Sequence, residues 1–162
     1  MDFFLYLCAQ ICCAHRCRCV RTGDIMRIYR KNEQMEFTKE QIVAAWEKAQ
    51  IVEGYDASRF RKDACGAWIV WEKYGVTDSP FGWEVDHIVP RSLLVKNGVP
   101  EEMIDNPLNL RAMHWENNRY KGDYYPSYMS KIIADGNSNA YRSQSMTVNV
   151  KIQEKLKTLY NL

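Results

Sequence analysis

The sequence predicts an α+β fold, in which helices and short strands follow one another along one chain, and three observations support it. Residues 38–50 and 148–159 repeat apolar side chains at helical spacing. Residues 67–71 and 83–89 are apolar, β-branched runs with the length of strands. With 162 residues there is room for one hydrophobic core and not for two, so we expect a single folded domain.

The first helix is predicted from its start signal. Thr38 and Gln41 have the spacing of a capping box, in which each side chain bonds the backbone of the other, and Phe37 and Ile42 are placed to pack across it. The apolar residues that follow at helical spacing are Ile42, Ala45, Trp46 and Ala49. We therefore expect order to begin near residue 37 and a helix over residues 38–50.

The middle of the chain is predicted to hold strands. Cys65-Gly66 is a turn signal, after which residues 67–71 form a strand or one arm of a hairpin, with Trp68 and Trp71 in the core rather than on a binding surface. A second strand covers residues 83–89 and ends at Pro90.

The second half of the chain is predicted to be mostly loop and helix. Residues 91–108 read as a long polar loop with one short helix after Pro100. A helix starts near Met113 and stops at Gly122. No element is predicted over residues 123–146, and Val148, Ile152, Leu156 and Leu159 mark a closing helix.

The amino end is rich in cysteine, five of which lie in the stretch CAQICCAHRCRC. A zinc site needs two spaced ligand pairs, and a site from three of these cysteines with His15 is a minor alternative. The apolar run of residues 3–14 is shorter than the about 20 residues that cross a bilayer, and its positive charges follow it, unlike those of a secretory signal. We expect residues 1–36 to be a disordered leader, no membrane partner, and a location in the reducing cytoplasm.

The numbers of basic and acidic residues do not by themselves indicate a nucleic-acid partner. Residues 1–31 hold six Arg and Lys side chains against two acids, whereas the rest of the chain holds 16 basic and 18 acidic side chains. A nucleic-acid-binding domain is usually strongly basic. Affinity for DNA would have to come from a local patch or from a protein partner that supplies specificity. The residues of such a patch would be Arg59, Arg61, Lys62, Arg111, Arg119 and Lys121.

The stretch WEVDHIVP, residues 83–90, contains the first candidate site residues. Asp86 and His87 interrupt an apolar run, and buried charges are costly unless they are paired or bind a metal. Asn and Asp oxygens suit Mg²⁺, and a neutral imidazole beside a cation suits a general base that takes a proton from water. The polar side chains downstream that could join them are Asn109, His114, Asn117 and Asn118.

The strand itself raises an objection to this site. Neighbouring residues on a regular strand point to opposite faces, so Asp86 and His87 converge only if the strand is distorted near Pro90. The alternative is that the two residues are simply exposed at a strand end. The ordered polar residues downstream favour a site over this alternative.

In order, D-H-I-V-P, N-L and N-N-R-Y-K-G-D closely resemble the motif of HNH endonucleases, especially the HNH nuclease domain of CRISPR effector proteins and small phage and bacterial HNH proteins. The resemblance covers residues 59–126. It implies a ββα-metal finger with flanking helices, its core at about residues 66–122 of a domain spanning residues 37–162. It also implies DNA, most simply double-stranded, as the partner.

The resemblance assigns roles by position. Asp86 and Asn118 would hold Mg²⁺ or Mn²⁺, and His87 would be the general base. Asn109 would fix the loop and orient His87 through its backbone rather than touch the substrate. The side chains placed for contact with the nucleic acid would be Arg111, Arg119 and Lys121.

The sequence departs from the zinc-bearing branch of this family. His114 and Asn117 stand where that branch has its second Cys pair, and Cys65 is the remnant of the first, so no structural zinc is expected. His114 is an accessory candidate, because it shares a helix face with Asn118. A structural hydrogen bond near the helix start is the reading we favour for it.

The leading hypothesis is therefore a metal-dependent endonuclease that hydrolyses DNA phosphodiester bonds. The main alternative is a catalytically silent nucleic-acid-binding module on the same scaffold. A toxin-type nuclease delivered into rival cells is a third reading, which the lack of a delivery domain in this sequence weakens.

Overall fold

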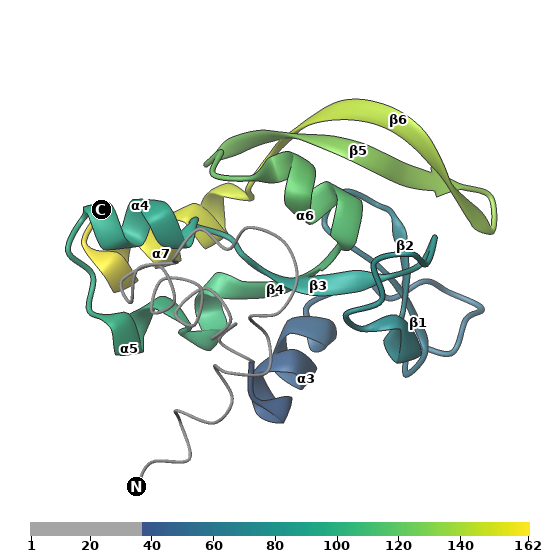
Figure 1. The fold of residues 1–162 in the computed structure, drawn as a ribbon, viewed down its shortest axis with the longest axis horizontal. Coiled ribbons are helices and arrows are strands. Elements are labelled where there is room, and N and C mark those ends of the chain that lie inside the picture. The colour runs from purple at the N-terminus through teal and green to yellow at the C-terminus, as the bar shows by residue number, and fades with distance from the viewer. Residues whose placement is uncertain (1–36) are drawn as a thin grey trace, which may run out of the picture. The chain divides into compact units, whose positions relative to one another are not determined.

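Three antiparallel strand pairs and the helices between them make up the described part of the chain, residues 37–162 of a computed structural model (Figure 1). This part forms one unit, Phe37–Leu162. The mixture of helices and small antiparallel hairpins confirms the predicted α+β class. The prediction of a disordered leader over residues 1–36 falls outside the described residues.

Helix α3, Lys39–Glu47, is the first element within residues 37–162, and it begins as its sequence predicts. Thr38 Oγ1 accepts a hydrogen bond from the Gln41 amide at 3.3 Å, and Gln41 Oε1 accepts one from the Thr38 amide at 2.9 Å. This capping box satisfies two of the amides that a helix start leaves without partners. The helix buries Ala45 and Trp46 against the strands that follow.

Strands β1, Phe60–Lys62, and β2, Trp68–Val70, pair antiparallel. A strand is therefore present within the predicted residues 67–71, and its partner lies upstream of the turn at Cys65-Gly66, where no strand was predicted. Gly66 has φ +85° in the connecting turn, a conformation that favours glycine. Trp68 is 5% exposed and belongs to the core, and the short helix η1, Trp71–Lys73, follows.

Strands β3, Trp83–His87, and β4, Leu110–His114, form the central antiparallel pair, with Trp83 opposite His114 and His87 opposite Leu110. β4 corrects the prediction of loop and helix over these residues. All five of its side chains are buried. A strand covered on both faces loses the alternation that identifies a strand in a sequence.

The connection from β3 to β4 is more ordered than expected. It holds α4, Arg91–Lys96, α5, Glu101–Ile104, and the short helix η2, Pro107–Asn109. The helix after Pro100 is confirmed, whereas the prediction of loop at Arg91–Lys96 was wrong. Leu94 anchors α4 in the core, and one buried residue is too weak a pattern to predict a helix.

Helix α6, Trp115–Lys121, follows β4 directly and ends at Gly122, as predicted. A long hairpin of β5, Ser127–Asp135, and β6, Ser138–Thr147, then occupies a segment for which no element was predicted. The closing helix α7, Val150–Tyr160, is confirmed, and its cap Asn149 accepts a hydrogen bond from the Lys151 amide at 3.0 Å.

The β3–β4 pair lies between two helices. Figure 1 shows α3 on one side of it and α6 on the other, with the β5–β6 hairpin running over α6. One core cluster joins α3 to β3 and β4, and a second lies among α4, α5 and α7. Within residues 37–162, no helix has the length and apolar character needed to cross a membrane.

Candidate functional site

Side chains of β3 alternate between the two helices that cover it. Trp83 and Val85 pack in the core cluster that includes α3, and the His87 ring lies 5.6 Å from the Phe37 ring. Asp86 instead contacts α6 through Lys121. The structure therefore places Asp86 and His87 on opposite faces of an undistorted strand, as strand geometry requires.

Asp86 lies in a buried ionic cluster. Its Oδ2 accepts a hydrogen bond from Arg111 Nε at 2.8 Å, and its Oδ1 accepts one from Lys121 Nζ at 2.9 Å. Lys121 Nζ also donates to the His87 carbonyl at 2.8 Å, and the Lys121 side chain is 2% exposed. Burial lowers the pKa of Lys121, and Asp86 opposes that shift. Arg111 and Lys121 thus lie in the interior, not on the exposed surface along which a duplex would pack.

His87 forms a dyad with an acid that the sequence did not reveal. Its Nε2 lies 2.7 Å from Asp105 Oδ1, just after α5. The His87 side chain is 17% exposed and that of Asp105 is 23% exposed, so both reach solvent. When Nε2–H donates this hydrogen bond to the Asp105 carboxylate, Nδ1 keeps the lone pair of a neutral imidazole.

Asn109 holds the backbone that follows His87. Its Oδ1 accepts a hydrogen bond from the Val89 amide at 2.8 Å, and its Nδ2 donates to the Val89 carbonyl at 3.1 Å. The Asn109 carbonyl accepts a further bond from the Ile88 amide at 2.8 Å. Asn109 is fully buried. It therefore fixes the chain through the backbone and does not face solvent.

Asn118 lies apart from Asp86 in the hydrogen-bond pattern. Its Nδ2 donates to Glu84 Oε2 at 3.0 Å, and Arg119 Nη2 lies 3.5 Å from Glu84 Oε1. Arg119 is 58% exposed and lies over the Trp115 ring at 5.0 Å. Of the three predicted nucleic-acid contacts, Arg119 is the one that the structure leaves on the surface.

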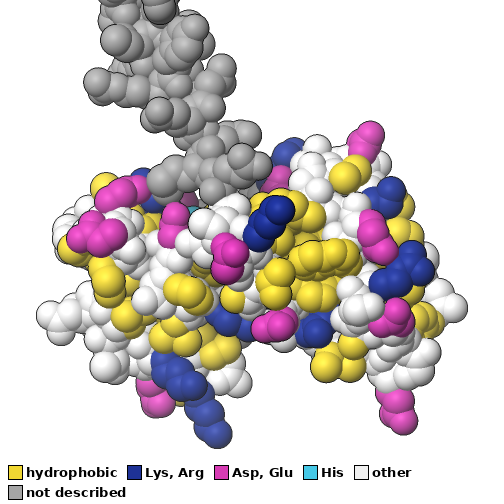
Figure 2. Space-filling model, turned by 90° about the horizontal axis from the view of Figure 1, so that it is seen from below, with side chains coloured by type: hydrophobic (Ala, Val, Ile, Leu, Met, Phe, Trp, Pro, Cys, Tyr) yellow, Lys and Arg dark blue, Asp and Glu magenta, His cyan; other side chains and the backbone are white. Residues whose placement is uncertain are grey.

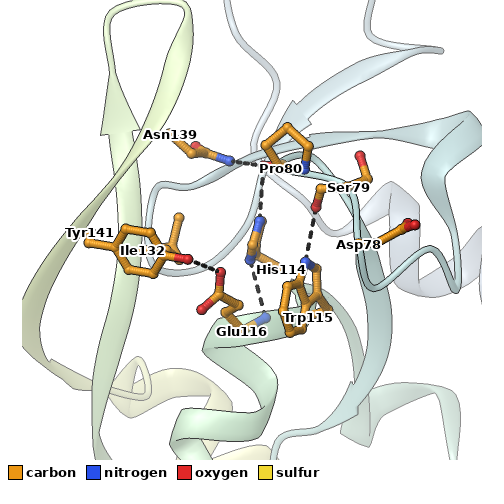
Figure 3. Close-up of a pocket in the computed structure, with 9 residues that line it drawn as sticks. All are labelled: Asp78, Ser79, Pro80, His114, Trp115, Glu116, Ile132, Asn139 and Tyr141. Atoms are coloured by element: carbon orange, nitrogen blue, oxygen red, sulfur yellow. Dashed lines mark hydrogen bonds between the residues drawn. The ribbon is translucent and has the colours of Figure 1, made fainter.

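His114 caps α6. Its Nδ1 accepts a hydrogen bond from the Glu116 amide at 3.2 Å, and its Nε2–H donates to the Pro80 carbonyl at 3.0 Å. Burial lowers the pKa of His114. Figure 3 shows its ring between Pro80 and Glu116, at a cavity of about 230 Å³ that Trp115 and Tyr141 also line. The structural hydrogen bond expected near the helix start is present.

Asp63 joins the β1–β2 turn to the start of α6. Its Oδ1 accepts from the amides of Cys65 and Ala67, both at 2.8 Å, and its Oδ2 accepts from the His114 amide at 3.1 Å and Asn117 Nδ2 at 3.0 Å. Burial raises the pKa of Asp63, and the four hydrogen bonds oppose the shift. The burial of Cys65, with help from Asp63, raises the pKa of its thiol to about 12, so this thiol is inert at neutral pH.

Asn117 docks the hairpin on α6. Its Oδ1 accepts hydrogen bonds from the amides of Lys131 and Ile132, both at 2.8 Å, and its Nδ2 donates to the Ile132 carbonyl at 2.9 Å. These contacts fall where the β5–β6 register shifts, between Ser130 and Ile132. A bulge leaves backbone groups without ladder partners, and the Asn117 amide supplies them.

The predicted metal ligands each bond to other side chains. Arg111 and Lys121 already occupy the Asp86 carboxylate, while Asn118 bonds Glu84. Among the residues described, no group of three His, Cys, Asp or Glu side chains is arranged to hold a metal. In this arrangement Lys121 Nζ lies where a cation would meet Asp86 Oδ1, so Asp86 could hold a divalent cation only after Lys121 had moved away.

Sequence reasoning missed Glu84, Asp63 and Asp105. Glu84 could have been found, since it lies two residues before Asp86 and therefore on the same strand face. Asp63 and Asp105 belong to a turn and a loop, whose partners spacing along the chain does not reveal.

Comparisons with protein-family models, with curated proteins and with solved structures found no match to this chain. The site must therefore be judged on its residues and their geometry.

Proposed function

We propose that this protein is an HNH-type endonuclease that hydrolyses DNA phosphodiester bonds, with His87 as the general base. The observation that carries the proposal is the His87–Asp105 dyad at the end of β3. A carboxylate that accepts Nε2–H orients the imidazole and stabilises the imidazolium formed when Nδ1 takes a proton from water. Both side chains are partly exposed, so water can reach the dyad.

The surrounding architecture supports the same proposal. Two antiparallel strands lead directly into α6, and the motif residues lie at the end of β3, just before β4 and on α6. Asn109 bonds the backbone beside His87, which is the role that the resemblance to HNH endonucleases implies for it. Mg²⁺ or Mn²⁺ is part of this proposal on the condition that Lys121 leaves Asp86.

A specific observation favours the alternative of a silent nucleic-acid-binding module. The Asp86 carboxylate is already neutralised by Arg111 and Lys121, which lowers its attraction for a metal. The face of the molecule on the α3 side also has mixed charge. Figure 2, which views the molecule from the α3 side, shows acidic, basic and apolar side chains interspersed, without a continuous basic face.

Nicking of supercoiled plasmid tests the proposal. Wild-type protein should relax the plasmid in Mg²⁺ and not in EDTA. His87→Ala should slow cleavage by about 10²–10⁴-fold, as expected for the loss of a general base. Asp105→Asn should slow it too, because the amide cannot stabilise the imidazolium. His114→Asn is the matched control, since it removes an imidazole outside the dyad.

Two results decide between the candidates. Cleavage by His87→Ala at the wild-type rate would remove His87 from the mechanism. DNA binding in a gel-shift assay, without cleavage in Mg²⁺ or Mn²⁺ by the wild type, would favour the binding module.

A further inference from the structure

A cavity of about 320 Å³ lies where the end of α3, the β1–β2 turn and the start of α7 meet β4, away from the dyad. Its floor is buried and includes Arg111, Tyr128 and Asp63. Its rim is exposed and includes Lys48, Gln50, Thr147 and Asn149. A buried floor with a polar, open rim is the form of a small-ligand site.

Arg111 offers this cavity an unused donor. Its Nε is bonded to Asp86, and its guanidinium lies over the Tyr128 ring at 5.2 Å. Its Nη2 is buried and has no hydrogen-bond partner among the described residues. Arg111 is 8% exposed, and a buried donor without a partner is costly. An acceptor in the cavity would remove that cost.

Two further features favour a negative ligand. Asn149, which lines the cavity, is the N-cap of α7, an eleven-residue helix whose positive dipole end therefore faces this region. The Lys48 ammonium bonds the carbonyls of Pro107 and Leu110 and forms no ion pair within residues 37–162.

The side chains around the cavity have a net positive charge. Asp86 is shared by Arg111 and Lys121, so that cluster keeps one uncompensated positive charge. The acid in the lining is Asp63, and its two oxygens already accept four N–H bonds. With Lys48 at the rim, the cationic side chains in and beside the cavity outnumber the acidic ones.

We propose that this cavity binds a phosphate group, held by Arg111 Nη2 and Lys48 at the N-terminus of α7. The planar guanidinium and a helix N-terminus are the donors that recognise phosphate oxygens in proteins. The group comes either from free phosphate or from the end of a nucleic acid. This site is separate from the dyad and does not depend on the proposed endonuclease activity.

Thermal unfolding with inorganic phosphate tests the proposal, against sodium chloride at equal ionic strength. Phosphate should raise the Tm of the wild type beyond chloride, because a ligand of the folded state stabilises it. Arg111→Lys keeps a cation for Asp86 but lacks the several N–H donors of the guanidinium group. It should weaken phosphate binding about tenfold or more, which is the effect of losing a charged hydrogen bond.

Two rim variants keep the test decisive if Arg111→Lys does not fold. Lys48→Met removes a cation, and Thr147→Glu adds a carboxylate, so each should lose most of the phosphate effect. The matched controls Lys73→Met and Ser145→Glu change exposed residues outside the cavity and should keep it. No phosphate-specific stabilisation of the wild type, or equal stabilisation of all five variants, would overturn the proposal.

A second arm identifies the source of the phosphate. Binding of a 5′-phosphorylated oligonucleotide, tighter than that of its 5′-hydroxyl form and weakened by Lys48→Met, assigns the site to nucleic-acid ends. Equal binding of the two oligonucleotides, with phosphate stabilisation intact, assigns it to small phosphates. His87→Ala should retain the phosphate response, which separates this proposal from the activity.

Discussion

Asp86 is held by two cations, and Lys121 is the one that a metal would have to replace. Lys121→Met should let a divalent cation reach Asp86, so calorimetry should show tighter Mn²⁺ binding than in the wild type. The same change should cost about 3 kcal/mol of stability, since Asp86 Oδ1 and the His87 carbonyl both lose their buried hydrogen-bond donor. Asp86→Asn is the control and should bind Mn²⁺ more weakly than either. Equal affinity in Lys121→Met and wild type would show that Lys121 does not compete with metal.

His114 should make stability depend on pH in the weakly acidic range. Burial lowers its pKa in the folded state from an ordinary 6.5, so the unfolded chain takes up a proton first as pH falls. The stabilisation is complete above pH 6.5 and is lost on acidification towards the folded pKa. His114→Asn keeps an acceptor for the helix cap and does not titrate, so its Tm should fall less between about pH 7 and 5.5. Parallel Tm curves for the two proteins would contradict this assignment.

Asn109 should matter more for stability than an ordinary polar residue. Asn109→Ala leaves the amide and carbonyl of Val89 buried without the side-chain partners they have now. At about 1–3 kcal/mol for each unsatisfied buried group, we expect a loss on the order of 3 kcal/mol in urea unfolding. Asn106→Ala, which removes one cap bond to the Leu108 amide, is the matched control and should cost about 1 kcal/mol. Equal losses of stability in the two variants would mean that the buried Asn109 hydrogen bonds stabilise the fold no more than an ordinary cap bond does.

At the scale of elements, α3 owes its start to local chemistry. Thr38→Ala removes the acceptor for the Gln41 amide and should cost about 1 kcal/mol. Thr38→Ser keeps the hydroxyl and should remain within a few tenths of a kcal/mol of the wild type. Chemical denaturation of both variants checks this, and a Thr38→Ser loss as large as that of Thr38→Ala would argue against the cap.

The elements that could be predicted are those whose signal is local. α3 and α7 have apolar residues at helical spacing together with cap residues, and β3 has a clear apolar run. β4 could not be found, because Arg111 was predicted to contact nucleic acid and His114 to lie at a helix start, although an ion pair and hydrogen bonds bury both in the strand. The β5–β6 hairpin was missed because β6 is almost wholly exposed and therefore has no apolar face.

The candidate site was predictable only where its signal is local in the sequence. The motif identifies Asp86, His87 and Asn109, and strand alternation explains why the first two face apart. The partner of His87 could not be predicted, since Asp105 reaches it across a connection of two helices. Lys121 was assigned to the surface because long cations are rarely buried, and here Asp86 and a carbonyl hold it inside.

At the scale of the whole molecule, charge sets how DNA binding responds to salt. Residues 37–162 hold 16 acidic and 16 basic side chains, and Arg59 is paired with Glu72 at 2.9 Å. Residues 37–162 alone should therefore bind a short duplex with a shallow dependence on salt, equivalent to fewer than about four phosphate contacts. The full chain, with its additional basic residues, should show a steeper slope. Fluorescence anisotropy between 50 and 200 mM salt measures both slopes, and equal slopes would exclude a contribution from the amino end.

The hydrogen bonds from Asn117 to the main chain of the β5–β6 hairpin determine which substitutions the hairpin tolerates. The Asn117 amide reads the main chain of residues 131 and 132, and every amino acid except proline presents the same N–H there. These main-chain contacts therefore do not depend on which side chain stands at position 131, where Lys131 adds an ion pair from its Nζ to Glu116 Oε2 on α6 at 2.6 Å. The exposed face of the hairpin can diversify over generations while Asn117 keeps its hold on the main chain, and proline at 131 or 132 is the replacement that this attachment forbids.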